Sequence, residues 1–92
     1  MDVEYTLRFS HTGSDDVESA LRHLSPLHAL GSPGAFELRH PGLVGGMPQA
    51  SIQVEPCGAY YCWYDVAGRE FLGTLVARLI REFGAVTVED RE

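Results

Sequence analysis

The side chains with metal-binding or nucleophilic chemistry are few, and their spacing is informative. They are four histidines and two cysteines: His11, His23, His28, His40, Cys57 and Cys62. Redox motifs and structural zinc sites use short spacings such as C-x-x-C, which Cys57 and Cys62 do not have. His23 and His28 are spaced so that they do not share a helical face. The sequence therefore predicts neither a metal site nor a bound cofactor.

A cysteine paired with a histidine would supply a nucleophile and a base. Cys57 or Cys62 with His11 or His40 would form such a pair. An activated thiol needs a helix N-terminus or a basic cluster beside it, and the sequence places neither there. Between aromatic residues, Cys62 is expected to be a small core hydrophobe. His11 and His40 follow strands expected to run the same way, which would bring both histidines to one rim of the sheet.

Two further motifs, a phosphate-binding loop and a pair of catalytic carboxylates, are incomplete. The glycine-rich stretch 42–46 precedes Met47 and Pro48 instead of a helix, so it does not predict a phosphate loop. Asp15 and Asp16 belong to the start of a predicted helix, where carboxylates suit the helix dipole. The last residues, 90–92, are a charged end, and Glu89 adjoins it. No pair of acids is expected to converge in a cleft, and the sequence favours a protein that is not an enzyme.

Composition limits the class of protein further. The chain has 92 residues, a formal net charge of −6 and no lysine, and its seven arginines are scattered. Nucleic-acid binding requires a basic stripe, which this distribution does not supply. No apolar run approaches the roughly 20 residues of a membrane helix, and the acidic start is unlike a signal peptide. We expect one cytoplasmic domain spanning 1–92, with free thiols and with neither nucleic-acid nor membrane partners.

The elements that must position these side chains follow from hydrophobic periodicity. Period-two alternation predicts strands at 3–10, 36–40, 50–55 and 85–89, with Val86 and Val88 facing inward in the last of these. Apolar stripes at helical spacing predict helices from 14 to 25 and from 66 to 83, the second ending at Gly84. Residues 26–30 are interpreted as a short extra helical turn and 41–48 as a hairpin connection. Segment 59–64 either continues the strand at 50–55 after a bulge or forms a strand of its own.

The expected order is strand, helix, strand, strand, helix, strand. This order resembles the ferredoxin-like sandwich, an α+β fold with an antiparallel four-stranded sheet, here with the third strand either whole or split, and two helices on one face. The resemblance covers the whole chain and rests on element order. It implies no particular activity, because this fold supports many unrelated functions.

The aromatic segment 59–64 differs from the other strands because both of its faces are apolar or aromatic. Tyr61 and Trp63 are assigned to the core, where the larger pair belongs. Tyr60 and Tyr64 are then expected on the opposite side of the sheet. There they join four charged side chains in a candidate binding surface: Arg8, Glu37, Arg39 and Glu55. Exposed aromatics among charges are typical of binding hot spots. In the alternative interpretation, the 41–48 segment folds over the tyrosines.

Three functions remain open on this evidence. The first is a non-catalytic protein-binding module, and in size, charge and surface aromatics the chain resembles the small acidic immunity proteins that bacteria keep against their own toxins. The second is a homo-oligomeric small-molecule-binding or regulatory domain whose tyrosines lie in a self-complementary interface. The third is a small ferredoxin-like enzyme using His11, His40, Cys62 and Tyr64. The first is our prediction, with a protein partner or self-association.

Overall fold

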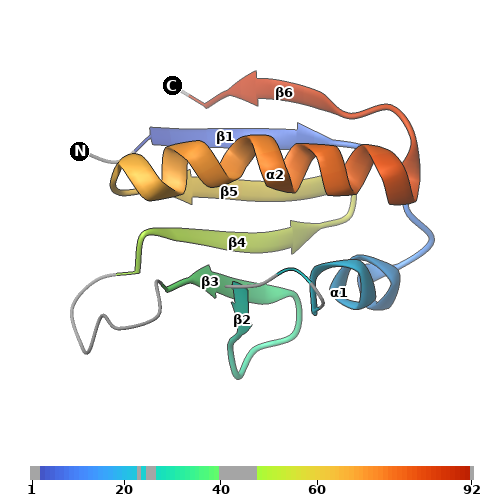
Figure 1. Ribbon diagram of the computed structural model, residues 1–92. Helices are drawn as coiled ribbons and strands as arrows, with labels where there is room; N and C mark the ends of the chain where they lie inside the picture. Colours follow the sequence, from blue (N-terminus) through green and yellow to red (C-terminus); the bar gives the residue numbers. More distant parts are fainter. Residues whose placement is uncertain (1–2, 23, 25–26, 40–47, 92) are drawn as a thin grey trace.

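The computed structural model describes residues 3–22, 24, 27–39 and 48–91, and Figure 1 shows their arrangement. Two helices and six strands follow one another along the chain. They are β1 (Val3–Arg8), α1 (Ser14–Arg22), β2 (Leu27–Ala29), β3 (Ala35–Leu38), β4 (Ala50–Glu55), β5 (Gly58–Trp63), α2 (Val66–Phe83) and β6 (Thr87–Asp90). The fold is therefore α+β, as predicted.

The sheet is open, with strand order β2-β3-β4-β5-β1-β6, and every neighbouring pair is antiparallel. The prediction of a four-stranded ferredoxin-like sheet is wrong, because the sheet has six strands. Segment 59–64 forms its own strand, paired with β4 on one side and β1 on the other. β1 and β3 run in opposite directions, so the expectation that His11 and His40 follow parallel strands is also wrong. His40 itself lies outside the described residues.

The additional strand is β2, where a helical turn was expected over 26–30. Leu27 pairs with Leu38 of β3 and is buried, whereas His28 and Ala29 are exposed. The loop that follows closes a hairpin, with the Leu30 N–H donating to the Ala35 carbonyl (2.8 Å). A strand of three residues is too short for alternation to be seen, so its tertiary pairing with β3 decides its conformation. The helix before it, α1, ends at Arg22 instead of near residue 25.

The long helix α2 has the predicted bounds, and capping explains both ends. The Asp65 carboxylate accepts from the Gly68 N–H at the start, and the Gly84 N–H donates to the Ile80 carbonyl at the end. The helix buries Phe71, Leu75 and Leu79, one stripe of its surface. In Figure 1 it lies across β1 and β5. Neither helix in the described part of the chain has the length and apolar composition required to cross a bilayer.

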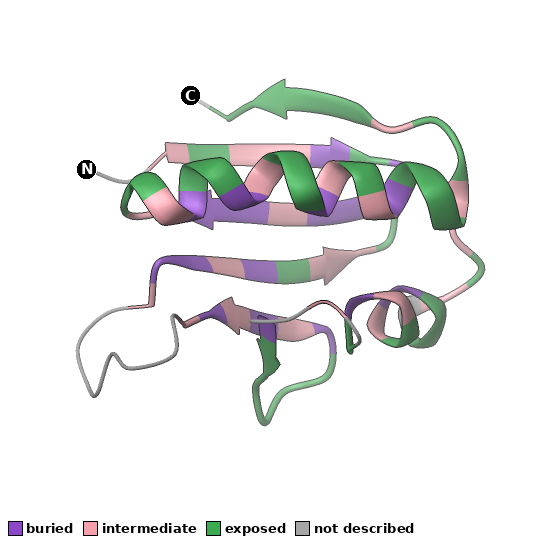
Figure 2. Ribbon diagram, viewed as in Figure 1, coloured by how far each residue is buried: buried purple, intermediate pink, exposed green. Residues whose placement is uncertain are grey.

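The core lies between the sheet and the two helices. Its largest fully buried side chains come from three strands and both helices: Tyr61, Phe36, Leu7, Leu21, Leu75, Leu79 and Val17. Figure 2 shows the buried positions concentrated on β4, β5 and the inward side of the helices, while β6 is exposed along its length. Val88 of β6 lies opposite Leu7 and so points to the helix side, as predicted, but it is 43% exposed. The helix layer does not extend over this edge strand, whereas Val86 packs partly against the core.

Candidate binding surface on the open face of the sheet

Strand register decides which side chains share a face of the sheet. Cross-strand partners in antiparallel strands point to the same side. Tyr61 of β5 pairs with Tyr5 of β1 and Ile52 of β4, and its hydroxyl donates to the Gly68 carbonyl of α2 (2.6 Å). This row therefore faces the helices. The neighbouring row, with Tyr60 between Thr6 and Gln53, points to the opposite side, which we call the open face.

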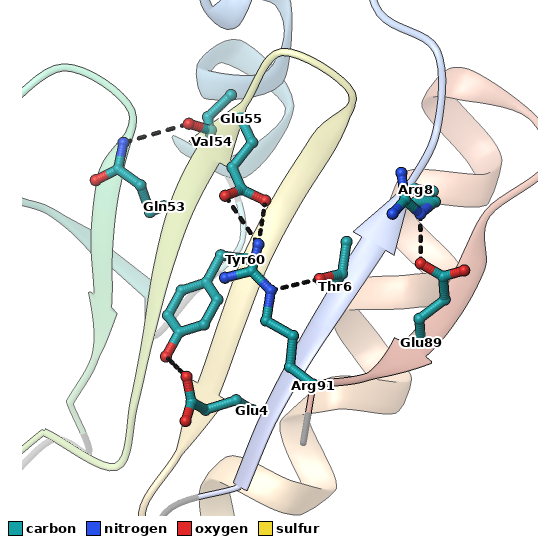
Figure 3. Close-up of polar contacts among 9 residues, drawn as sticks. All are labelled: Glu4, Thr6, Arg8, Gln53, Val54, Glu55, Tyr60, Glu89 and Arg91. Carbon is teal, nitrogen blue, oxygen red and sulfur yellow. Dashed lines mark hydrogen bonds and ion pairs between the residues drawn. The ribbon is translucent and has the colours of Figure 1, made fainter.

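Tyr60 lies near the middle of the open face, on one of the central strands. Its hydroxyl donates to the Glu4 carboxylate of β1 (2.7 Å), and the guanidinium carbon of Arg91 lies 4.8 Å from the centre of its ring (Figure 3). The pKa of the Tyr60 phenol is raised, first by burial and then by its hydrogen bond to Glu4. The ring is half-buried, with its hydroxyl held by Glu4 and Arg91 lying over it.

The Arg91 side chain reaches across more strands than the other ion pairs described on this face. It follows β6, and its Nε donates to the Thr6 hydroxyl (2.7 Å) while one terminal nitrogen donates to both carboxylate oxygens of Glu55 (3.1 and 3.2 Å). One side chain therefore links the β6 edge to β1, β5 and β4 (Figure 3). From the sequence, Arg91 was expected only to be part of a charged end. The signal that identifies it is parity, because Thr87, Glu89 and Arg91 alternate in step along one side of β6.

Two further ion pairs lie on the same face, one on each side of this centre. Arg8 of β1 pairs with Glu89 of β6, and the Glu89 carboxylate raises the pKa of the Arg8 guanidinium. Arg39, just after β3, pairs with Glu37 at 2.5 Å. The structure therefore brings Glu55 and Tyr60 together with Arg91, places Arg8 beside Glu89 on the β6 side, and places Glu37 and Arg39 two strands away from Tyr60.

Tyr64 lies beyond the end of β5, next to the Glu37 side of the open face. Its hydroxyl and that of Ser51 are 3.0 Å apart and form a hydrogen bond, and Ser51 pairs with Glu37 in the sheet. Like Tyr60, Tyr64 is half-buried. The alternative prediction, that segment 41–48 covers the two tyrosines, depends on residues 40–47, which lie outside the described residues.

Among the described residues considered for catalysis, His11 and Cys57 line one hollow, whereas Cys62 lies far from His11. The register places Glu4 opposite Cys62 and Arg8 opposite Gly58, so about 13 Å of strand separates Cys62 from the end of β1 that leads to His11. The His11 Nε2 is 2.8 Å from the Glu55 carbonyl and must donate to it, because a carbonyl only accepts. Cys62 is 3% exposed, on the same side of the sheet as Tyr60, in keeping with the small hydrophobe expected there.

Of the predicted binding residues, Arg8 and Glu55 each line a hollow in the part of the surface that the structure describes. The largest, about 620 Å³, lies between the β1–α1 turn and the end of α2 and is lined by Ser10, His11, Thr12, Asp16, Ser19, Ala20, Arg78, Glu82 and Phe83. Another hollow holds Arg8, His11 and Cys57. Within 3–22, 24, 27–39 and 48–91, no three His, Cys, Asp or Glu side chains lie close enough to share a metal ion.

Comparison with known proteins does not assign the chain to a family. No protein-family model, curated protein or solved structure matches the chain. The functional argument therefore rests on the open face itself.

Proposed function

We propose that the protein is a non-catalytic protein-binding module and that the open face is its contact surface. The observation that carries the proposal is Tyr60, a half-buried aromatic ring on a central strand of the side opposite the helices. Tyrosine and arginine are enriched among the residues that dominate binding energy, and they act best when surrounded by polar groups that exclude water. Glu4 holds the ring hydroxyl in position before binding, which reduces the entropy lost when a partner covers it.

The charges of the open face favour a partner with matching polar groups over a simply basic one. The whole chain has a net charge of −6, which speeds encounter with a basic partner. Among the described residues, the open face carries four glutamates and three arginines, so its own balance is close to neutral: Glu4, Glu37, Glu55, Glu89, Arg8, Arg39 and Arg91. We therefore assign long-range attraction to the chain as a whole and specificity to the paired charges around Tyr60 and Tyr64.

An inhibitor of immunity type is the specific form of this function that we favour. In this role the domain would cover a toxin's active site with its tyrosine-bearing surface, and the paired charges around Tyr60 would meet matching polar groups there. The compartment that fits the proposal is the cytoplasm, because Cys57 and Cys62 are both free thiols, and Cys57 is exposed.

The test begins with affinity capture from the source cells, using the wild-type chain, Tyr60→Ser and the control Arg81→Ser on the exposed side of α2. Each captured protein is then purified, and its affinity for the three variants is measured by titration calorimetry. We expect Tyr60→Ser to weaken binding by about 30-fold or more, the size of a hot-spot loss, and the control to stay within about threefold of wild type.

Two results contradict the proposal. One is a purified partner that binds Tyr60→Ser as tightly as wild type. The other is capture of nothing except the chain itself, together with sedimentation as a dimer that Tyr60→Ser dissociates. That second result would assign the face to self-association, as in a homo-oligomeric ligand-binding or regulatory domain.

A further inference from the structure

The surroundings of Tyr60 have the features of a receptor for a planar cation. One wall is the tyrosine ring, the second is the Glu55 carboxylate and the third is the Thr6 hydroxyl, and these come from three adjacent strands. An aromatic face attracts a cation, and a carboxylate accepts two parallel N–H bonds or one shared N–H from a guanidinium. In the free protein this space is filled by Arg91 (Figure 3).

We propose that the open face holds a guanidinium-binding subsite, which Arg91 fills in the free protein and which receives an arginine side chain of the partner protein in the complex. This rests on the proposed function, and it specifies the chemistry of the partner. Arg91 is thus an internal competitor that the partner's arginine displaces.

Every contact of the Arg91 side chain is one that another arginine can reproduce. The Nε bond to Thr6 and the terminal nitrogen on Glu55 use the fork of the guanidinium, and its positive charge lies over the Tyr60 ring. A lysine ammonium is a compact charge without this fork, so it can satisfy only part of the arrangement. The geometry therefore favours arginine over lysine.

Arg91 can leave without taking the strand with it. Its side chain is 43% exposed, so its ion pair with Glu55 is weak, whereas its backbone N–H donates to the Glu4 carbonyl (2.9 Å) and continues the pairing of β6 with β1. The receptor walls stay in place, because Thr6, Glu55 and Tyr60 belong to three paired strands and Glu4 still holds the Tyr60 hydroxyl. The subsite is preorganised for a second guanidinium.

Charge explains why the replacement must be a cation. Once Arg91 leaves, the Glu4 and Glu55 carboxylates flank the Tyr60 ring without the guanidinium that lay over it. Two carboxylates beside an aromatic face attract a cation and disfavour a neutral or acidic group. An arginine at the centre of the partner's surface meets this requirement and places an arginine against a tyrosine, the pairing common at hot spots.

The direct experiment uses N-acetyl-arginine amide as the probe and needs no partner. The probe is titrated into ¹⁵N-labelled wild type, Arg91→Ala and the control Arg81→Ala, and amide shifts of β1, β4 and β5 are followed. We expect Arg91→Ala to reach half-saturation at a probe concentration at least about fivefold lower than wild type and the control, since exposed cation–π and ion-pair contacts have this size. Arg91→Gln serves as a second opened variant.

Specificity is tested with matched probes and double variants. N-acetyl-citrulline amide has the shape of the arginine probe without its charge and should give no saturable shift, and N-acetyl-lysine amide should bind more weakly. Adding Tyr60→Leu or Glu55→Gln to Arg91→Ala should remove saturation by the arginine probe. The proposal is overturned if neither Arg91→Ala nor Arg91→Gln binds the probe better than wild type, or if citrulline or lysine binds equally well.

Once the partner is identified, its affinity for two variants gives an independent test, because the two substitutions should change that affinity in opposite directions. Arg91→Ala should bind it about threefold or more tightly, because the competitor is gone, whereas Tyr60→Ser should bind it more weakly. Unchanged or weaker binding by Arg91→Ala overturns the displacement while leaving the open face as the contact surface. If the partner binds Tyr60→Ser as tightly as wild type, while the arginine probe still binds Arg91→Ala as expected, the proposed function is overturned and the subsite remains.

Discussion

Tyr60 and Tyr61 are neighbours on β5 with the same side chain and opposite surroundings. Tyr61 is fully buried, and its hydroxyl donates to the backbone carbonyl of Gly68 in α2. Tyr60 points to the open face, and its hydroxyl donates to the carboxylate of Glu4. Both phenols are hydrogen-bonded and both have a raised pKa, with burial as the largest cause in each case.

The two tyrosines differ in whether the groups that contact them can move. The Gly68 carbonyl is part of a packed helix and has no alternative position, so Tyr61 ties α2 to the sheet. Glu4 and Arg91 are exposed side chains that can exchange their contacts for those of another molecule at little cost. One tyrosine therefore contributes to stability, while the other remains available for recognition.

The largest expected effect comes from truncating each ring. Tyr61→Ala removes a fully buried side chain and leaves a cavity, which costs about 3–5 kcal/mol, whereas Tyr60→Ala should cost about 1 kcal/mol or less. The measurement is urea unfolding followed by far-ultraviolet circular dichroism. Losses of equal size would show that Tyr60 also supports the fold and would remove the contrast.

A smaller effect is expected at the helix that Tyr61 contacts. A Cβ at Gly68 would lie 2.2 Å from the Gln49 carbonyl oxygen and 2.8 Å from the Trp63 Cβ, so Gly68→Ala should destabilise the protein by about 1–3 kcal/mol. Gly73 is the matched control, because its Cβ would meet nothing within 4 Å and alanine is the better helix former. Gly73→Ala should stabilise by about 0.5–1 kcal/mol in the same unfolding experiment. The same sign for both variants would contradict close packing at Gly68.

The smallest effect concerns ionisation of the two phenols. Because both folded-state pKa values are raised above the ordinary value of about 10, their contribution to stability is complete below that pH and is lost as the pH rises above it. Glu4→Gln should lower the pKa of Tyr60 and leave that of Tyr61 unchanged. Ultraviolet difference titration detects both, with Tyr60→Phe and Tyr61→Phe to assign the transitions. If the pKa of Tyr60 were unchanged by Glu4→Gln, the role given to this carboxylate would be contradicted.

Hydrophobic periodicity and capping residues predicted the elements whose conformation depends on residues close together in the sequence. Helix α2 follows from a long apolar stripe, Asp65 and Gly84, and the period-two alternation of β5 separates Tyr60 from Tyr61. The strand β2 was missed because three residues do not establish a period, and its conformation comes from pairing with β3. Element order also does not specify which strands are neighbours or their directions, so the six-stranded order was not predictable from it.

The candidate surface was predicted only in part for a related reason. Tyr60, Arg8 and Glu55 follow from strand parity, and the structure places them on one face. Arg91 was missed because it follows the strand predicted at 85–89. The parity of Thr87 and Glu89 extends to it, but its contacts with β1, β5 and β4 are not encoded locally. Such contacts depend on strand order, which only the complete sheet supplies.

The place of β1 in the sheet has a consequence for synthesis on the ribosome. Its sheet partners are β5 and β6, and even the nearest pairing, Arg8 with Gly58, joins residues 50 positions apart in the chain. At ordinary translation rates this strand emerges about 3–10 s before its first neighbour exists. An unpaired strand carrying Tyr5 and Leu7 invites aggregation, and charged residues interrupting such a segment oppose it. Glu4 and Arg8 thus protect the nascent chain before they take up their positions in the finished sheet.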